Sequence, residues 1–251
     1  QSIYERKKIM NITIFKRAGA YLFDILVVSM IVSLLSYLPI LNPNRTLYSE
    51  KYNELVNVYE QYENKEINES EYDEARIPIS YELYRLNVYY VVLDVIIVLL
   101  YFGVVPYFFD GQTVGKKLFQ IKIVSNDNKP LTITNYLLRT IVLNNILISV
   151  ILQCIVSFIS VDNYYLLYQN VNVVGYIIMY INLFMIIVRK DNRGLHDFVA
   201  GTKVKYIGNE EKKREAKIEE EQAVLISEKE IKPKKSKEDK TTPIRKTKKN
   251  K

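Results

Sequence analysis

The chain has 251 residues, of which 49% are hydrophobic and 25% charged, and its formal net charge is +7 at pH 7. The hydrophobic residues form four long stretches with the charges between and after them, which excludes a soluble helical bundle, because its helices would carry a polar face at every turn. A single Cys excludes an internal disulfide, and a single His with no neighbouring His–Cys–acid cluster disfavours a metal site.

Each hydrophobic stretch is long enough to cross a bilayer of about 30 Å. The first contains an ionisable residue, Asp24, seven residues after Arg17, so both lie on one helical face. A charge at membrane depth is costly unless a partner offsets it, so we expect these two residues to form a site. The stretches predict four transmembrane helices, at residues 17–41, 86–109, 137–161 and 171–188.

The segments outside these helices differ in charge. Residues 1–16 and the loop 110–139 are basic, whereas the loop 42–85 holds ten acidic and five basic residues. Lys and Arg near helix ends prefer the cytoplasm, so both termini are expected to be cytoplasmic and the acidic loop to face outward. Tyrosines at helical spacing within the outer loop predict a helical hairpin there. These features indicate a multi-pass protein of the cell membrane.

Two short segments on the cytoplasmic side, 120–124 and 202–207, alternate apolar and charged residues and are expected to pair as a small ribbon. Residues 208–251 form a charged tail, helical at first and then too polar to bury a core, so its last part should be disordered. The tail is read as a solvated extension, or else as a contact for anionic lipid. Interleaved acids disfavour nucleic acid as its partner. The predicted fold class is an all-α membrane protein, a four-helix bundle with this ribbon and tail.

The polar residues of the membrane helices fall into two layers. At about 1.5 Å per residue, Asp24 lies about 10 Å from the cytoplasmic end of its helix, and Asp94 lies about 22 Å from the corresponding end of its own. The two aspartates are therefore not expected to share a hydrogen bond. The inner layer comprises Asp24, Asn144, Asn145 and Asn182, and the outer layer comprises Asp94 and Gln153.

Two glycine-containing blocks follow the second and fourth helices, DGQTVGKKLFQIKIV at 110–124 and RGLHDFVAGTKVKY at 193–206. Together with Arg17 and Asp24, they resemble the RDD family of small bacterial membrane proteins, named for one arginine and two aspartates. The resemblance covers residues 13–207. The turn residues of the two motifs are Gly111, Gln112, Thr113, Gly115, Lys116, Gly201 and Thr202.

The resemblance implies that Arg17 and Asp24 are the family's arginine and first aspartate. Its second aspartate is assigned to Asp197, with Asp94 as the other candidate. Basic residues at the cytoplasmic helix ends can reach a buried carboxylate through their long stems. The expected cluster is therefore Arg17, Asp24, Arg139, His196 and Asp197.

Two roles for this cluster stay open, a clamp that fixes helix packing and a transport site. The first motif lacks one residue of a phosphate-binding loop and follows no strand, so nucleotide binding is disfavoured. No nucleophile–His–acid set or catalytic carboxylate pair is present, so we expect neither an enzyme nor a cofactor.

The resemblance implies a small-ion or small-solute transporter, including cation/proton exchange. In that hypothesis Asp24 binds a monovalent cation or a proton and Arg17 sets its affinity. Four helices enclose little volume, which suggests a homo-oligomer. The alternative is a non-transporting scaffold or accessory subunit that recruits a partner through its tail.

Overall fold

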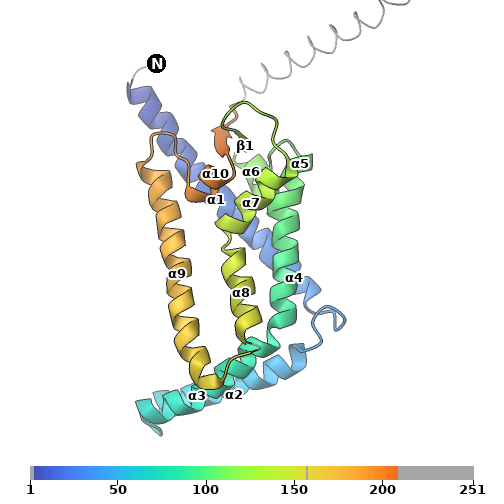
Figure 1. Cartoon of the computed structure of the whole chain (residues 1–251), viewed down its shortest axis with the longest axis vertical. Coiled ribbons are helices and arrows are strands. Elements are labelled where there is room, and N and C mark those ends of the chain that lie inside the picture. The colour runs from blue at the N-terminus through green and yellow to red at the C-terminus, as the bar shows by residue number, and fades with distance from the viewer. Residues whose placement is uncertain (1–2, 157, 209–251) are drawn as a thin grey trace, which may run out of the picture. The chain divides into compact units, whose positions relative to one another are not determined.

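The computed structural model describes residues 3–156 and 158–208 and divides the chain into two units, residues 1–206 and 207–251. The predicted tail, from residue 209 on, lies outside the described residues. Figure 1 shows the elements of the first unit. In chain order they are α1 (Ile3–Leu35), α2 (Arg45–Glu63), α3 (Glu69–Leu86), α4 (Val88–Val98), the π-helix η1 (Leu99–Val104), α5 (Val105–Phe108), α6 (Val114–Leu118), β1 (Ile121–Ser125), α7 (Ile133–Leu143), α8 (Ile146–Val156), α9 (Val161–Val188), α10 (Leu195–Val199) and β2 (Thr202–Tyr206).

The described part of the chain is mostly helical and holds three helices long and apolar enough to cross a membrane. They are Ile14–Leu35 of α1, the run Val88–Phe108 through α4, η1 and α5, and all of α9. A fourth candidate is the pair α7 and α8, whose axes are bent by 64°. This first unit therefore has three to four candidate spans.

The third predicted helix, 137–161, is wrong as a single helix, because the chain breaks between α7 and α8. Asn145 has a φ of 50° there, in the left-handed region that an α-helix cannot continue through. The fourth helix begins earlier than the predicted residue 171, at Val161, directly after Ser160. The first ends at Leu35 rather than at residue 41, because Pro39 has no backbone N–H to donate to the Leu35 carbonyl and its ring would clash with that carbonyl.

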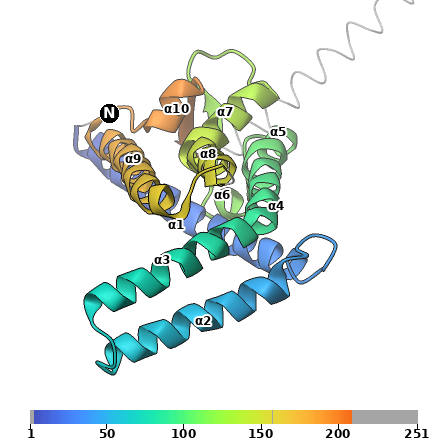
Figure 2. The same ribbon diagram turned by 60° about the horizontal axis from the view of Figure 1, so that its bottom comes forward.

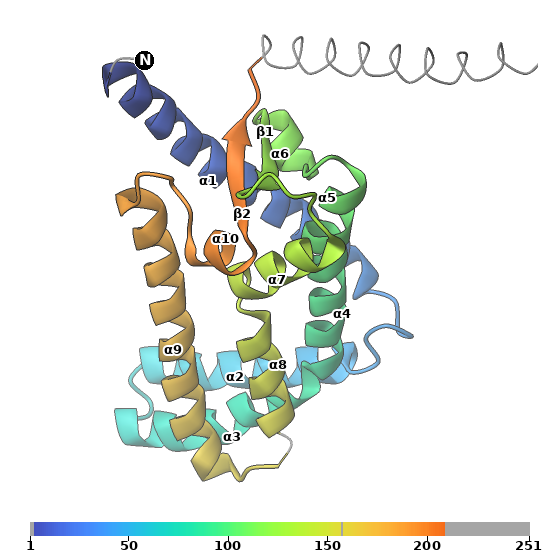
Figure 3. The ribbon, with the colours of Figure 1, turned by 45° about the horizontal axis from the view of Figure 1, so that its top comes forward.

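The loop 42–85 is a helical hairpin, as the tyrosine spacing predicts (Figure 2). Helices α2 and α3 pack against each other, and the rings of Tyr62 and Tyr72 stack with centroids 4.7 Å apart. Asn68 caps α3 by accepting hydrogen bonds from the backbone N–H groups of Ser70 and Glu71. In Figures 1 and 3 the hairpin lies at the end of the spans opposite to the β-strands.

The predicted ribbon is confirmed as a two-stranded sheet (Figure 3). Strands β1 and β2 pair antiparallel, with Ile121 opposite Tyr206 and Ser125 opposite Thr202. The sheet lies at the same end of the unit as the short helices α6 and α10. It thereby ties together the two motif segments, which follow the second and fourth candidate spans.

The main apolar core joins α1 to the second span. Val28 and Val32 of α1 pack with Leu93, Val98 and Phe102. Within the second span, η1 replaces the α-helical register by a wider turn, and its residues 101–103 are all buried. Because π-helical segments occur often at functional sites, η1 and the part of α1 beside it are candidates for a functional site.

Candidate functional site

Two carboxylates, those of Asp24 and Asp197, have no solvent exposure. Asp24 contacts α6 and Asp197 belongs to α10, and these two short helices lie at the end of the unit that carries the sheet (Figure 3). An ionised carboxylate buried in this way is costly unless it is paired and hydrogen-bonded. Each of the two has its own set of donors, so they form two neighbouring centres.

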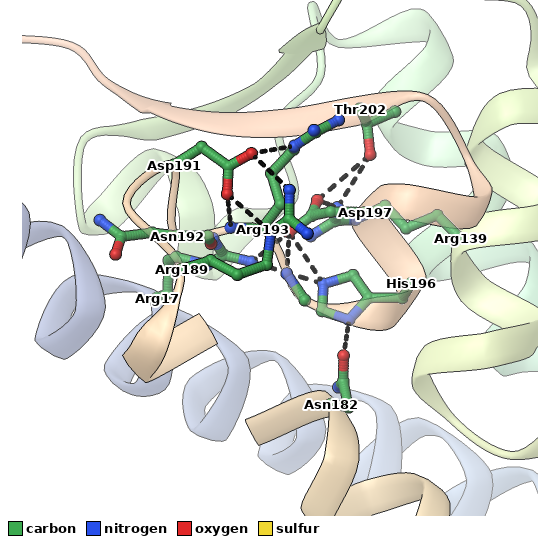
Figure 4. A network of polar contacts seen from close by, with 11 residues as sticks. Arg17, Arg139, Asn182, Arg189, Asp191, Asn192, Arg193, His196, Asp197 and Thr202 are labelled. Atoms are coloured by element: carbon green, nitrogen blue, oxygen red, sulfur yellow. Dashed lines mark hydrogen bonds and ion pairs between the residues drawn. The ribbon is translucent and has the colours of Figure 1, made fainter. Parts of the chain in front are cut away.

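The Asp197 centre collects residues from α1, α7, α10 and β2 (Figure 4). Arg17 Nη2 donates to Asp197 Oδ2 at 2.5 Å, and Arg139 Nη1 donates to the other carboxylate oxygen, Oδ1. The hydroxyl of Thr202 donates to Oδ1 at 3.2 Å, and the backbone N–H of Gly194 donates to Oδ2 at 3.3 Å. Two guanidinium groups, one from α1 and one from α7, therefore share one carboxylate.

The Asp24 centre joins α1 to the second span and to the first motif. Tyr101 Oη and the backbone N–H of Gly115 both donate to Asp24 Oδ1, each at 2.7 Å. Thr113 Oγ1 donates to Oδ2 at 2.5 Å, and Lys116 Nζ lies 3.7 Å from the same oxygen. The first motif thus supplies a hydroxyl, a backbone amide and an ammonium to one aspartate.

Arg17 does not pair with Asp24 in the structure. The carboxylate that Arg17 binds is that of Asp197. The seven-residue spacing does place both residues on α1. However, Cα–Cβ bonds of a helix tilt toward its N-terminus, so the long Arg17 side chain extends away from Asp24 toward α10. The shorter Asp24 side chain meets α6, which packs directly against α1.

The first motif has its donors aligned by a tight turn. Gly111 has a φ of 74°, which favours glycine, and its N–H donates to the carbonyl of Pro106 at 2.7 Å. Gln112 Nε2 donates to the carbonyl of Ile121 at 2.9 Å, which fixes the turn to β1. Thr113 then caps α6, and its hydroxyl oxygen also accepts a hydrogen bond from the Lys116 ammonium at 3.1 Å.

His196 bridges the Asp197 centre to α9. Burial, and after it the neighbouring Arg139, Arg17 and Lys116, hold the pKa of His196 well below its usual value, so the ring is neutral at pH 7. Its Nδ1 lies 2.6 Å from Asn182 Oδ1. Its Nε2 lies 3.4 Å from Arg17 Nη2 and 3.3 Å from Asp197 Oδ2, so the ring contacts both members of the ion pair.

A cavity of about 480 Å³ lies beside both centres, between α1, the α7–α8 break, α9 and α10. Asn144 and Asn145 stand at the break itself. The Asn144 side chain accepts from Tyr21 Oη at 3.1 Å, and Asn145 Nδ2 donates to the carbonyl of Gly175 at 3.3 Å. The polar residues lining the cavity are Arg17, Tyr21, Lys116, Arg139, Asn144, Asn145, Asn182 and His196.

The structure therefore divides the predicted inner layer. The three asparagines line the cavity, while Asp24 stands behind its wall, bound to the first motif. The predicted outer layer does not form a contact. Gln153 Nε2 donates to the carbonyl of Tyr84 at 3.3 Å, and among the described residues Asp94 makes no hydrogen bond or ion pair. Asp197, rather than Asp94, is the second aspartate of the buried site.

Three contributors to the site escape sequence reasoning. Tyr101 binds Asp24 from the π-helix, Tyr21 binds Asn144, and the carbonyl of Asn192 accepts from Arg17 Nη1. The role of Tyr101 could be predicted from sequence, because a tyrosine hydroxyl deep in an apolar run needs a hydrogen-bond partner. The carbonyl of Asn192 could not be predicted in this way, since every residue has a backbone carbonyl.

An ion-pair network flanks the Asp197 centre (Figure 4). Arg189 and Arg193 both bind Asp191, at 2.9 and 2.7 Å, and hydrogen bonds from Arg189 foremost hold the pKa of that carboxyl below its usual range. Two arginines thus share one aspartate in this network, as Arg17 and Arg139 share Asp197. Within the described residues, no three His, Cys, Asp or Glu side chains are close enough to share a metal ion.

One comparison with known proteins identifies a family. The model of the RDD family matches residues 12–201. The chain is 30% identical over 111 residues to the uncharacterized protein YckC of Bacillus subtilis (strain 168), a match covering 44% of this chain and 58% of that protein. The match therefore spans less than two thirds of the relative. No solved structure gives a significant match.

Proposed function

Because the chain belongs to the RDD family and carries a polar cavity at a broken membrane segment, we propose that it transports small solutes across the membrane. In this proposal the spans form a four-helix bundle with α7 and α8 as one broken span. The solute occupies the cavity, and the two buried aspartates hold the surrounding elements in place.

The single observation that carries the proposal is the break at Asn144–Asn145. Irregular backbone at membrane depth is tolerated where protein buries it or where it lines a water-filled cavity, and discontinuous helices commonly form transporter binding sites. Here the two asparagines at the break line the cavity together with Asn182 of α9. Their amide groups offer both donors and acceptors to a bound solute.

The geometry favours a solute in the cavity over a cation bound to Asp24. Three hydrogen-bond donors and the Lys116 ammonium already surround the Asp24 carboxylate. Exchange of a monovalent cation at Asp24 would require these donors to move away. Cation/proton exchange is therefore the less favoured form of the transport proposal.

Transport is tested with the full chain purified and reconstituted into liposomes. Probes are radiolabelled Na⁺ under an imposed pH gradient and radiolabelled inorganic phosphate. Flux of either probe that Ala18→Leu abolishes supports the proposal, because Ala18 lines the cavity and leucine fills part of it. The matched control is Ser29→Leu, which places the same side chain at another exposed position of α1, outside the cavity lining. Absence of flux for both probes, or flux unaffected by Ala18→Leu, would contradict it.

A scaffold role remains the second candidate, and one observation favours it. Both buried carboxylates are fully engaged by internal donors, as expected of a clamp that only fixes helix packing. In that case Asp24→Asn lowers stability and neither form shows flux. The tail that would recruit a partner lies outside the described residues.

For orientation, we propose that the end with α6, α10 and the sheet faces the cytoplasm, because the basic segments adjoin it and the acidic hairpin lies at the other end. In a Cys154→Ser background, Asn64→Cys between α2 and α3 should react with an impermeant maleimide on intact cells. Lys129→Cys, in the loop after β1, should react only after lysis. The reverse labelling pattern would overturn this orientation.

A further inference from the structure

The charges around the cavity are not balanced. Arg17, Lys116 and Arg139 all line it, whereas no Asp or Glu is found among the described residues of its lining. The two carboxylates that these cations bind are buried behind the wall. A molecule inside the cavity therefore meets cationic and amide groups on its polar side.

The buried cluster as a whole carries one more positive charge than negative. Its cations, Arg17, Lys116 and Arg139, have side-chain exposures of 10%, 9% and 6%, and its two aspartates have none. His196 adds no charge, since its ring is neutral. Taking a charge out of water without a partner is unfavourable, so this arrangement calls for a negative group supplied from outside the described chain.

The remaining wall of the cavity is apolar. Alanines of α1 and aliphatic side chains from several elements surround the polar corner, so a bound molecule needs an apolar body beside its charged group. The apolar residues of the lining are Ile14, Ala18, Ala20, Ile121, Leu143, Met179, Leu183, Ile186 and Val204.

We propose that the cavity binds an amphipathic phosphate ester, with the anionic phosphate against Arg17, Lys116 and Arg139 and the apolar portion against α1 and α9. Guanidinium groups suit this role because their fork of donors matches phosphate oxygens, and an ammonium adds a point charge. The volume of about 480 Å³ lies within the usual range for a small-molecule site. This inference rests on the proposed function and names the chemical class of its solute.

The test is equilibrium binding to the full chain in a non-ionic detergent, by isothermal titration calorimetry. The probes are dihexanoyl phosphatidylglycerol, dihexanoyl phosphatidylcholine and inorganic phosphate. We expect saturable binding of the anionic lipid, at least about tenfold tighter than that of the zwitterionic lipid, a difference of about 1.4 kcal/mol. Inorganic phosphate binding as tightly as the anionic lipid would assign the site to a free phosphate. Equal binding of the two lipids, or none, would overturn the proposal.

Two pairs of variants locate the binding. Lys116→Met removes the excess charge and should weaken anionic-lipid binding by at least about tenfold. Lys117→Met, an exposed neighbour on the same short helix, should leave it unchanged. Since Lys116→Met also takes a partner from Asp24, Ala18→Leu tests the same cavity with all charges retained, and Ser29→Leu is its control. Binding that survives both Lys116→Met and Ala18→Leu contradicts the proposal.

Binding and flux separate this inference from the transport proposal. Lipid-phosphate binding in detergent with no flux in liposomes would uphold the inference and count against transport. Na⁺ flux sensitive to Ala18→Leu without anion binding would uphold transport and overturn the inference.

Discussion

The backbone N–H of Gly115 donates to Asp24 Oδ1 at 2.7 Å, and this contact sets how closely α6 approaches α1. A Cβ atom on Gly115 would lie 2.3 Å from the carbonyl oxygen of Ala20 and 2.8 Å from Asp24 Cγ. Neither neighbour can yield easily, because one is helix backbone and the other a fully buried carboxylate. The glycine of the first motif is thus a requirement of packing around Asp24.

Gly115→Ala should therefore lower the free energy of unfolding by about 1–3 kcal/mol, the usual cost of overpacking a tight site. Thermal unfolding of the detergent-solubilised protein measures it. Gly175→Ala on α9 is the matched control, since a Cβ there meets only Ile148 at 3.7 Å, an ordinary contact. Equal effects of the two substitutions would show that α6 and α1 are not in close contact.

Asp197→Asn should destabilise the protein by about 3–5 kcal/mol, because it leaves two buried guanidinium groups without their carboxylate. The control is Asp191→Asn, which also has two arginine partners but whose side chain is 39% exposed. Exposed ion pairs contribute about 0–1 kcal/mol, so this change should be small. A loss for Asp191→Asn that equals or exceeds the loss for Asp197→Asn would argue against a buried clamp.

Much of the fold follows from local sequence patterns. The long apolar runs, the helical hairpin and the paired strands each depend on periodicity within a short segment, which sequence displays directly. The break between α7 and α8 is not evident from the sequence, because neither Gly nor Pro marks it. Two asparagines in an apolar run read as polar residues of a continuous helix, while Asn145 in fact takes a left-handed conformation.

The membership of the site was largely predictable, whereas its pairings were not. Arg17, Arg139, His196 and Asp197 do meet, and the turn residues Thr113, Gly115, Lys116 and Thr202 serve as donors. Arg17 and Asp197 are 180 positions apart, so no local spacing indicates that they pair. The short distance from Arg17 to Asp24 in sequence favours a different partner. Only the packing of α6 against α1, and of α10 against α7, decides between the two carboxylates.

Anion binding in the cavity should weaken as pH rises through about 8. Burial foremost, with Arg139 and Arg17 opposing Asp24, lowers the pKa of Lys116 from 10.5 to about 8, so its ammonium loses its charge in that range. His196 stays neutral throughout. Titration calorimetry with dihexanoyl phosphatidylglycerol suits this test, because its phosphodiester keeps one charge between about pH 7 and 10. In Lys116→Met the residual affinity should not change with pH, and an unaltered pH profile in that variant would assign the titration to another group.

The same pKa shift predicts that stability rises with pH between about 8 and 10.5. The Lys116 pKa is lower in the folded state than in the unfolded chain, so in this window the unfolded chain binds more protons and deprotonation favours folding. Other groups titrate nearby, so the measured quantity is the difference in unfolding free energy between wild type and Lys116→Met. This difference should grow in favour of wild type as pH rises from about 8. A constant difference would contradict the buried position of the ammonium.

Asn145 should tolerate glycine better than valine, because its φ of 50° lies where a β-branched side chain is strained. The left-handed conformation costs about 1–2 kcal/mol for such residues, so Asn145→Val should be less stable than Asn145→Gly by about that amount. At Asn57, an exposed residue inside α2, the order should reverse, since glycine is the poorer helix former. Thermal unfolding of the four variants gives the two differences. If valine is preferred at both positions, α7 and α8 form one continuous helix in the membrane, and the cavity at their break is lost with it.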